Sequence, residues 1–379
     1  MFDFEIYRRA FSDSNLYNRV WDVGTMNLYI SIILLVALFG LFTDNVRSKT
    51  KSICFMVVAT ILTALLGLRG RDVGMDTRVY QDSFLYSLTP NAFSDSTSEP
   101  GYHFILKVLR TFFSSPELAI LIFSAATIFF VMNTVWRYKN HISLFIAFSF
   151  YVGIFYFQAL NLLRIYLAAS FILWNYDYLI EKKYKKFAVI VLLTSLLHYS
   201  SLIMLLPLGY LWLYQRKPKI ALLLIAGAFV VVVKIANHFA DYLFIARYAD
   251  YGDSNDVSGR IGLMLFFDYI PCFYLVYYIY KNKIRGQWSD LLVSLSITGF
   301  FVRFMAYYIN IAGRLGTHFM GLFVLILPYF THHIKRYHRG QYIPFVSFLL
   351  IYLVVRIHFY FIGYLATDGI MPYNFFWND

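Results

Sequence analysis

The sequence predicts an all-α integral membrane protein that crosses the bilayer about ten times. Its composition is far from that of a soluble domain, because 60% of the 379 residues are hydrophobic and only 14% are charged. Apolar runs long enough for a helix to cross a bilayer fill most of the chain. Basic residues gather in the short connections between these runs, as they do on the cytoplasmic side of membrane proteins.

The apolar runs give the order of the expected helices. They cover residues 27–43, 51–68, 117–135, 142–157, 160–180, 187–214, 220–237, 262–280, 288–309, 313–331 and 341–361. We expect residues 27–379 to form one multi-span membrane domain. Residues 1–26 are expected to form an N-terminal segment at the outer surface.

Six short connections carry more than half of the 33 lysines and arginines. Their basic residues are Arg47, Lys49 and Lys51; Arg137 and Lys139; Lys182, Lys183, Lys185 and Lys186; Arg216, Lys217 and Lys219; Lys281, Lys283 and Arg285; and Lys335, Arg336 and Arg339. By the positive-inside rule these connections face the cytoplasm. The longer connections 69–116 and 238–261 are then expected to face the outer side of the membrane. A net charge of +12 therefore needs no nucleic acid to explain it.

The basic clusters at 182–186 and 216–219 conflict with a single span between them, because one span would place them on opposite sides. A re-entrant hairpin over residues 187–214, turning near His198, resolves the conflict. Residues 187–197 would rise about 16 Å as a helix, roughly half of the bilayer. Non-helical backbone at that depth requires a protein or water-filled cavity around it. The alternative is a plain span and one exception to the rule.

In the stretch from Gly67 to Tyr80 a hydrophobic span gives way to polar residues, with the sequence Gly-Leu-Arg-Gly-Arg-Asp-Val-Gly-Met-Asp-Thr-Arg-Val-Tyr. Its glycines allow close approach of the backbone to a ligand, and Arg69 and Arg71 offer planar charged groups suited to phosphate oxygens. The alternative is a juxtamembrane loop whose arginines extend to lipid headgroups.

Two amphipathic helices are expected in the first outer connection. Asp76 can cap a helix that runs from Thr77 to Leu88 and ends before Pro90. Pro100 can open a second helix with one apolar and one basic side. Both are typical of helices that lie in the interface of the outer leaflet.

Further arginines fall on the same outer side, either at the ends of spans or in the second outer connection. They are Arg164, Arg247, Arg303 and Arg314. Each alone is typical of a residue that reaches the interface or pairs helices. Contributed together by separate spans, they form an arrangement suited to holding a polyanion.

Sequence motifs for nucleotide binding, dinucleotide binding and metal-dependent sugar transfer are absent. Neither G-x-x-x-x-G-K-[ST] nor G-x-G-x-x-G occurs, and no Asp-x-Asp is present. The two cysteines, Cys54 and Cys272, both lie in apolar runs and indicate neither a disulfide framework nor a metal site. We expect no metal and no cofactor.

The Gly67–Tyr80 run resembles the R-G-x-x-V-G-x-D-T-x-x-Y motif of the EpsG-type polysaccharide polymerases, relatives of the O-antigen polymerase Wzy. The other matching segments, in chain order, are Leu163-Arg-x-x-Leu-Ala168 with Lys-Lys-Phe187, His198-Tyr-Ser-Ser-Leu202, Arg247-Tyr248, Gly313-Arg314 and Met371-Pro-Tyr373. Arg71 stands where the pattern has an extra residue, so either Arg69 or Arg71 corresponds to the arginine of the motif.

The resemblance implies a glycosyltransferase of the bacterial inner membrane. It would act at the periplasmic face and transfer a growing glycan between undecaprenyl-pyrophosphate-linked repeat units. The residues implied for the pyrophosphate are Arg69, Arg71, Arg164, Arg247 and Arg314, and those implied for other substrate contacts are Tyr80 and Tyr248. Arginines in a shielded cavity can neutralise a pyrophosphate leaving group without a metal. His198 is the first candidate for the base that activates the acceptor hydroxyl, and Asp76 is the second.

The implied partners are lipid-linked glycans, membrane lipids, and the chain-length regulator and flippase of the same pathway. A ligase that moves finished polysaccharide to another lipid would use nearly the same residues. A flippase for lipid-linked oligosaccharide is the non-enzyme alternative, for which paired halves with matching broken helices would be expected. An accessory protein whose arginines bind only anionic lipid is the remaining possibility.

Overall fold

The computed structural model describes residues 5–13, 20–46, 48–89, 99–243, 262–308 and 312–378. Within these residues the secondary structure is helical, and the β-type pairing there is one isolated bridge between Arg69 and Phe375. The predicted all-α class is therefore confirmed for the described part of the chain.

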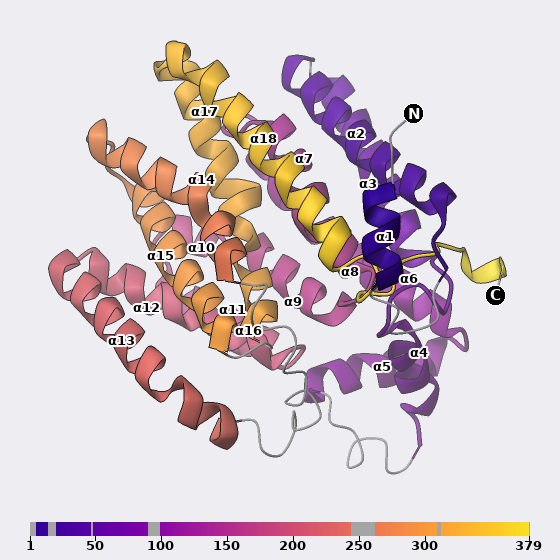
Figure 1. Ribbon diagram of the computed structural model, residues 1–379. Coiled ribbons are helices and arrows are strands. Elements are labelled where there is room, and N and C mark those ends of the chain that lie inside the picture. Colours follow the sequence, from indigo (N-terminus) through magenta and orange to yellow (C-terminus); the bar gives the residue numbers. More distant parts are fainter. Residues whose placement is uncertain are drawn as a thin grey trace.

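Every apolar run expected from the sequence corresponds to one or more helices (Figure 1). The N-terminal half contains α1 (Glu5–Asp13), α2 (Val23–Asn45), α3 (Ser48–Gly67), α4 (Thr77–Tyr86), α5 (Pro100–Phe112), α6 (Pro116–Arg137), α7 (Leu144–Phe150) with a π-helical turn (Tyr151–Tyr156) and α8 (Phe157–Ala159), α9 (Leu163–Trp174), α10 (Asp177–Ile180) and α11 (Tyr184–Ser195). The C-terminal half contains a 3₁₀ turn (Tyr199–Met204), α12 (Leu205–Tyr214), α13 (Pro218–Leu243), α14 (Gly262–Lys281), α15 (Gln287–Tyr308), α16 (Ala312–Leu315), a 3₁₀ turn (Gly316–Phe319), a π-helical turn (Leu322–Ile326), α17 (Leu327–Tyr337), α18 (Arg339–Gly363) and a 3₁₀ turn (Phe376–Asn378).

Six helical segments among the described residues are long and apolar enough to cross a membrane, which supports a multi-pass membrane protein. They are Val23–Asn45, Lys49–Gly67, Pro116–Arg137, Gln287–Met305, Gly313–Tyr337 and Arg339–Gly363. Shorter apolar helices cover Leu144–Ala159, Tyr199–Tyr214 and Pro218–Val231. The total of about ten crossings stays a prediction.

The short basic connections meet at one end of the bundle, which we call the basic end and define as the described residues 44–46, 48–51, 137–143, 181–186, 215–219, 281–287 and 335–342. Arg137 at this end forms an ion pair with Asp177 in the neighbouring helix α10. The amide of Gln215 donates to Gln287 at 2.8 Å. Figure 1 shows the ends of α2, α14 and α17 on one side of the molecule and helices α4 and α5 on the other. Positive charge is therefore segregated along the bundle.

Residues 184–215 fold back on themselves. Helix α11 leaves the basic end, the chain turns at His198, and the 3₁₀ turn with α12 returns to the basic end. The hydroxyl of Tyr184 donates to Gln215 at 2.5 Å, so the two ends of the segment touch. The two neighbouring basic clusters thus lie at one end of the molecule, as the charge pattern predicted. The position of this turn within a membrane stays a prediction.

Helices α4 and α5 cover the end of the bundle opposite the basic end. Asp76 occupies the N-cap position of α4, but its side chain makes no capping hydrogen bond, so the predicted cap is wrong. Its backbone is helical, with φ −85° and ψ −5°, whereas a capping side chain reaches back from an extended residue. Helix α4 ends at Tyr86, and Pro90 lies outside the described residues. Pro100 opens α5 as predicted.

Candidate active site

The polar turn after α3 is joined to the C-terminal segment by backbone hydrogen bonds. Gly74 N donates to Gly369 O at 2.9 Å, and Met75 N donates to Asp368 O at 3.1 Å. Gly74 has a φ of +88°, and a Cβ at this position would lie 2.1 Å from Leu160 O. Only glycine fits both the backbone conformation and the close approach. The turn is therefore held between residues that are distant in the sequence.

Arg69 lies inside this junction, with 1% of its surface exposed. Its Nε donates to Thr77 Oγ1 at 3.1 Å, and its Nη1 donates to the carbonyl of Leu66. Burial lowers the pKa of Arg69 to about 10, which still leaves the group charged at neutral pH. Arg69 is thus an enclosed cation that joins α3 to α4, and a ligand cannot reach it in this conformation.

Asn161 links the backbone of Asp76 to the carboxyl group of Asp368. The backbone N–H of Asp76 donates to Asn161 Oδ1 at 3.0 Å, and Asn161 Nδ2 donates to Asp368 Oδ1 at 3.2 Å. The hydroxyl of Tyr360 donates to Asp368 Oδ2 at 2.8 Å. Asn161 lies in the break between α8 and α9, where its side chain can reach both partners. The break thus links the polar turn to the C-terminal segment.

Both carboxyl groups are partly withdrawn from solvent. Burial raises the pKa of Asp368 to about 6, against the opposing effects of its two hydrogen-bond donors and of Arg314. Burial also raises the pKa of Asp76, although Arg314 and Arg164 act in the opposite direction. Arg314 itself is exposed at the start of the 312–319 helical segment. A cation therefore lies near two carboxyl groups of which one titrates near neutrality.

Arg164, in the first turn of α9, lies between an acid and two aromatic rings. Its Nη1 is 3.1 Å from Glu99 Oε2, and its guanidinium lies 4.9 Å from the ring centre of Tyr102 and 5.9 Å from that of Tyr80. The hydroxyl of Tyr80 is in turn 3.5 Å from Asp76 Oδ2. Arg164 is therefore held in one orientation and connected to the carboxyl pair through Tyr80.

A chain of polar groups leads from Glu99 into the bundle. Glu99 Oε1 accepts from Tyr199 N at 3.1 Å and lies 3.9 Å from His198 Nδ1. Ser200 Oγ is 2.7 Å from His198 Nδ1 and 2.7 Å from Nε2 of the buried His318. Because the Ser200 N–H also donates to His198 Nδ1, this nitrogen is an acceptor, and a neutral His198 carries its proton on Nε2.

Two arginines share one carboxylate deeper in the bundle. Asp268 Oδ2 is 2.9 Å from Arg303 Nε, and Asp268 Oδ1 is 2.7 Å from Arg356 Nε. Arg303 Nη1 also donates to Gly313 O at 3.4 Å, one residue before Arg314. The group of three carries one net positive charge among membrane helices, where an unbalanced charge is costly. The excess positive charge of this Asp268 group adds to that of the exposed Arg314.

The structure brings five of the nine predicted site residues together: Asp76, Tyr80, Arg164, His198 and Arg314. Together with Glu99, Asn161, Ser200, His318 and Asp368 we call them the polar cluster. Arg69 is enclosed next to it. Arg71 is exposed and pairs with Asp82 at 2.8 Å. Arg247 and Tyr248 lie outside the described residues.

Sequence reasoning missed the acidic and hydroxyl members of the cluster. Glu99 appeared as the end of a polar connection, and His318 as one polar residue inside an apolar run. Asp368 lies three residues before the Met371-Pro-Tyr373 segment, which was the available signal for it. Asp268 and Arg356 carried a separate signal, because ionisable residues within apolar runs are rare.

Comparison with known proteins assigns the chain to a family. Residues 52–375, which include all members of the polar cluster, match the EpsG family. Searches of curated proteins and of solved structures returned no match. The matched region extends from α3 to the C-terminal segment and thus covers most of the chain. The protein therefore belongs to the EpsG family, which indicates a polymerase of polysaccharide biosynthesis.

Proposed function

We propose that the protein polymerises oligosaccharide repeat units carried on undecaprenyl pyrophosphate, at the periplasmic face of the bacterial inner membrane. The polar cluster is the observation that carries this proposal. Arginines and carboxyl groups with raised pKa values meet at the end of a helix bundle opposite its basic connections. Membership of the EpsG family supports the polymerase reaction.

The proposed reaction transfers the whole growing glycan to the next lipid-linked repeat. A hydroxyl oxygen of the acceptor sugar forms a bond to the anomeric carbon of the donor, and the bond from that carbon to the pyrophosphate oxygen breaks. The acceptor proton passes to a base, and the carrier leaves as lipid pyrophosphate. The site must therefore supply cations at the leaving group and a base at the acceptor hydroxyl.

Arg314 and Arg164 are the proposed cations. Arg314 is exposed, and its charge acts on both carboxyl groups of the cluster. Arg164 is preorganised by Glu99 and by its aromatic neighbours, and its planar group can contact two phosphate oxygens at once. The net positive charge of the Asp268 group lies behind Arg314 and favours an anion there. Arg69, being enclosed, is assigned to the architecture of the site.

The carboxyl pair supplies the proposed base. A base is most effective when its pKa lies near the working pH, and the pKa of Asp368 is raised to about 6. Asp76 is the alternative acceptor of the proton, since burial also raises the pKa of its carboxyl group. His198 stays a candidate, but its Nδ1 already accepts from Ser200. We therefore assign His198 to the polar chain that holds Glu99 and Arg164.

The orientation follows from the charge pattern. The basic end is proposed to face the cytoplasm by the positive-inside rule. Helix α11 leaves that end and the chain turns at His198, so the polar cluster would face the periplasm. Under this proposal residues 187–214 are the re-entrant hairpin, and its tip contributes to the site. The cluster then lies where lipid-linked acceptors and donors are both delivered.

The test is complementation of a strain from which this gene is deleted, with the surface polysaccharide resolved on a gel. Wild type, Arg314→Ala, Asp368→Asn and His198→Ala are compared with Arg71→Ala as the matched control. We expect deletion to leave lipid-anchored sugar bearing a single repeat. The three cluster variants should fail to restore the ladder, although immunoblots of membranes show normal amounts of protein.

The other function classes give different results in the same strain. Loss of all attached sugar on deletion would favour a ligase or a flippase and contradict the polymerase. A normal ladder with Arg314→Ala and Asp368→Asn would contradict the assignment of the site while leaving the reaction class open. If Arg71→Ala failed as completely as the cluster variants, the distinction between clustered and exposed arginines would be wrong.

A further inference from the structure

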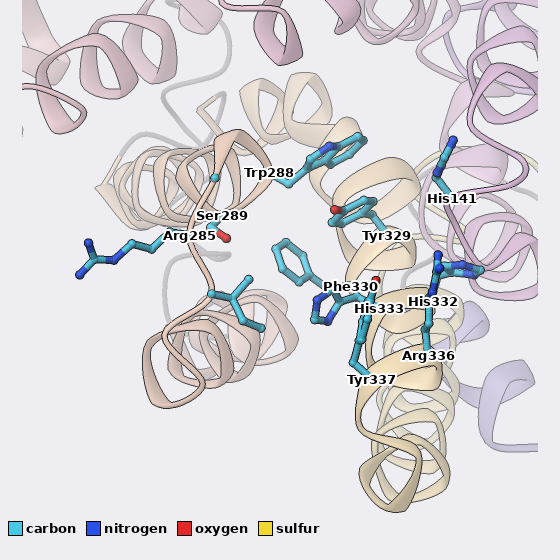
Figure 2. A pocket seen from close by; sticks show the side chains of 12 residues that line it. His141, Arg285, Trp288, Ser289, Tyr329, Phe330, His332, His333, Arg336 and Tyr337 are labelled. Carbon is cyan, nitrogen blue, oxygen red and sulfur yellow. The ribbon is translucent and has the colours of Figure 1, made fainter.

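A cavity of about 310 Å³ opens at the basic end, far along the bundle from the polar cluster. It lies between the end of α17, the first turn of α15, the connection that precedes α15, and His141 after α6 (Figure 2). Its volume corresponds to roughly ten water molecules in the liquid. It is therefore large enough for a phosphate group with a small ester substituent.

The charged lining of this cavity is entirely basic. The side chains of His141, Arg285, His332, His333 and Arg336 line it, and none of its twelve lining residues is acidic. Figure 2 shows His332, His333 and Arg336 projecting from one helix, and Arg285 on the opposite wall with its guanidinium directed away from them.

The nearest acids are already engaged. Asp44, whose charge reaches His332, accepts from Leu144 N at 2.9 Å, Phe145 N at 3.2 Å and Ser143 Oγ at 3.1 Å. Asp290, in the first turn of α15, accepts from the amide of Gln215 at 2.8 Å. The positive potential of the cavity is therefore not cancelled by a lining carboxylate.

Two polar groups in the lining lack a partner among the described residues. The Nδ1 atom of His333 is buried and makes no hydrogen bond. Ser289 is 5% exposed, and no hydrogen bond of its hydroxyl is formed within the part of the chain described here. Ser289 and Gly286 also place the start of α15 at the cavity, where backbone N–H groups point outward from the helix. The unmet groups can donate to an anion.

The opposite wall is flat and aromatic. The rings of Trp288 and Tyr329 are stacked with centroids 4.0 Å apart and an interplanar angle of 4°. Buried Phe330 continues this wall. Figure 2 shows Trp288 and Tyr329 side by side above the histidines. An apolar surface next to basic groups suits an ester whose phosphate is charged and whose substituent is not.

We infer that this cavity binds the phosphate group of an anionic ester at the basic end of the protein. Arg336 and the histidines of α17 contact the phosphate oxygens, and Arg285 adds positive charge from the opposite wall. The start of α15 and Ser289 donate further hydrogen bonds. The Trp288–Tyr329 wall packs against the uncharged part of the ester. The phosphate belongs either to a membrane lipid headgroup or to a soluble phosphate ester.

The lipid arm of the test uses the purified full chain in a neutral detergent. Native mass spectrometry measures retained phosphatidylglycerol, with phosphatidylcholine as the uncharged reference. We expect Arg285→Gln with Arg336→Gln to weaken phosphatidylglycerol binding at least tenfold. The control is Lys335→Gln with Arg339→Gln, which removes the same charge from exposed residues of the basic end outside the cavity. Its binding should change less than twofold.

The soluble arm measures thermal unfolding of the same proteins with inorganic phosphate or glycerol 3-phosphate, against chloride at equal ionic strength. Stabilisation by either soluble anion that disappears in the cavity variant identifies the phosphate group alone as sufficient. Lipid binding without such stabilisation identifies a headgroup site. Equal losses in the cavity and control variants would overturn the proposal in favour of general charge attraction, and so would unchanged binding in both.

Discussion

The basic end and the polar cluster lie at opposite ends of the same bundle and use charged side chains differently. At the basic end, exposed cations outnumber acids. Of its acids, Asp44 accepts from the first turn of α7 and Glu181 pairs with Lys183. In the polar cluster, cations and acids are mixed, and residues from separate helices hold one another. The exposed arginines of the basic end have few partners that hold them in one place. In the polar cluster Arg164 is held by Glu99 and Tyr102, and a fixed position is what stabilisation of a reacting group requires.

The largest expected effect concerns the arginines of the cluster. Arg314→Ala and Arg164→Ala should each lower the initial rate of polymerisation by membranes at least about 100-fold, because a pyrophosphate leaving group loses its cation. Removal of Arg285 and Arg336 at the basic end should leave the rate within about twofold, since those cations lie away from the reacting atoms. Arg→Lys at the cluster positions keeps the charge but loses the planar contact, so an intermediate loss is expected. Equal losses of rate from the cluster variants and from the basic-end variant would contradict the distinction between the two ends.

The second prediction concerns pH. The folded-state pKa of Asp368 is raised to about 6, so a base at this position becomes protonated as pH falls through 6, and the rate should fall with it. Asp368→Asn should remove most activity and also abolish this fall in rate at acid pH, the acid limb of the pH profile. Asp76→Asn should lower the rate and keep the limb, while Asp82→Asn, on the exposed pair with Arg71, serves as control. An acid limb retained by Asp368→Asn would transfer the base role to Asp76 or His198.

The third prediction sharpens the contrast through stability. Asp268→Asn leaves Arg303 and Arg356 without their shared counter-charge among membrane helices, and loss of one member of a buried ion pair costs about 3–5 kcal/mol. Thermal unfolding in detergent measures the effect. Asp177→Asn at the basic end, where the side chains are more exposed, should cost less. The reverse order would show that the Asp268 group is open to solvent.

A smaller effect is expected from the polar turn. Gly74→Ala must adopt a φ of +88° and approach Leu160 O, so we expect a loss of about 1–3 kcal/mol together with reduced polymer. Gly209→Ala in α12 is the matched control, because no atom lies within 4 Å of its added Cβ. Alanine there should be neutral or stabilising by up to about 1 kcal/mol. Similar unfolding temperatures for the two variants would argue against the tight junction.

The smallest effect concerns Arg71. Its pairing with Asp82 is exposed on both sides, and such pairs contribute about 0–1 kcal/mol. Arg71→Ala should therefore leave both the unfolding temperature and the polymer ladder nearly unchanged. A severe loss of polymer with normal protein would instead identify Arg71 as the arginine of the sequence motif and place the substrate over α4.

The sequence predicted the helices well because hydropathy is a local property. Each apolar run forms one or more helices. The requirement that two neighbouring basic clusters lie on the same side predicted the fold-back that brings Tyr184 to Gln215. It was less successful for individual side chains. Asp76 has the residue type of a cap, yet its helical backbone directs the carboxyl toward Tyr80. Arg69 has the residue type of a ligand contact, yet the C-terminal segment covers it.

The amino-acid sequence by itself determined the class of protein, the order of its helices and the grouping of basic residues into connections. The family resemblance also rested on the order of short motifs. Only the tertiary structure decided which charges meet, because the partners are distant in the chain. Arg164 and Glu99 are 65 residues apart, and Asn161 and Asp368 are 207 apart. Burial and pairing set the pKa of a carboxyl group, and both arise only when such segments pack together.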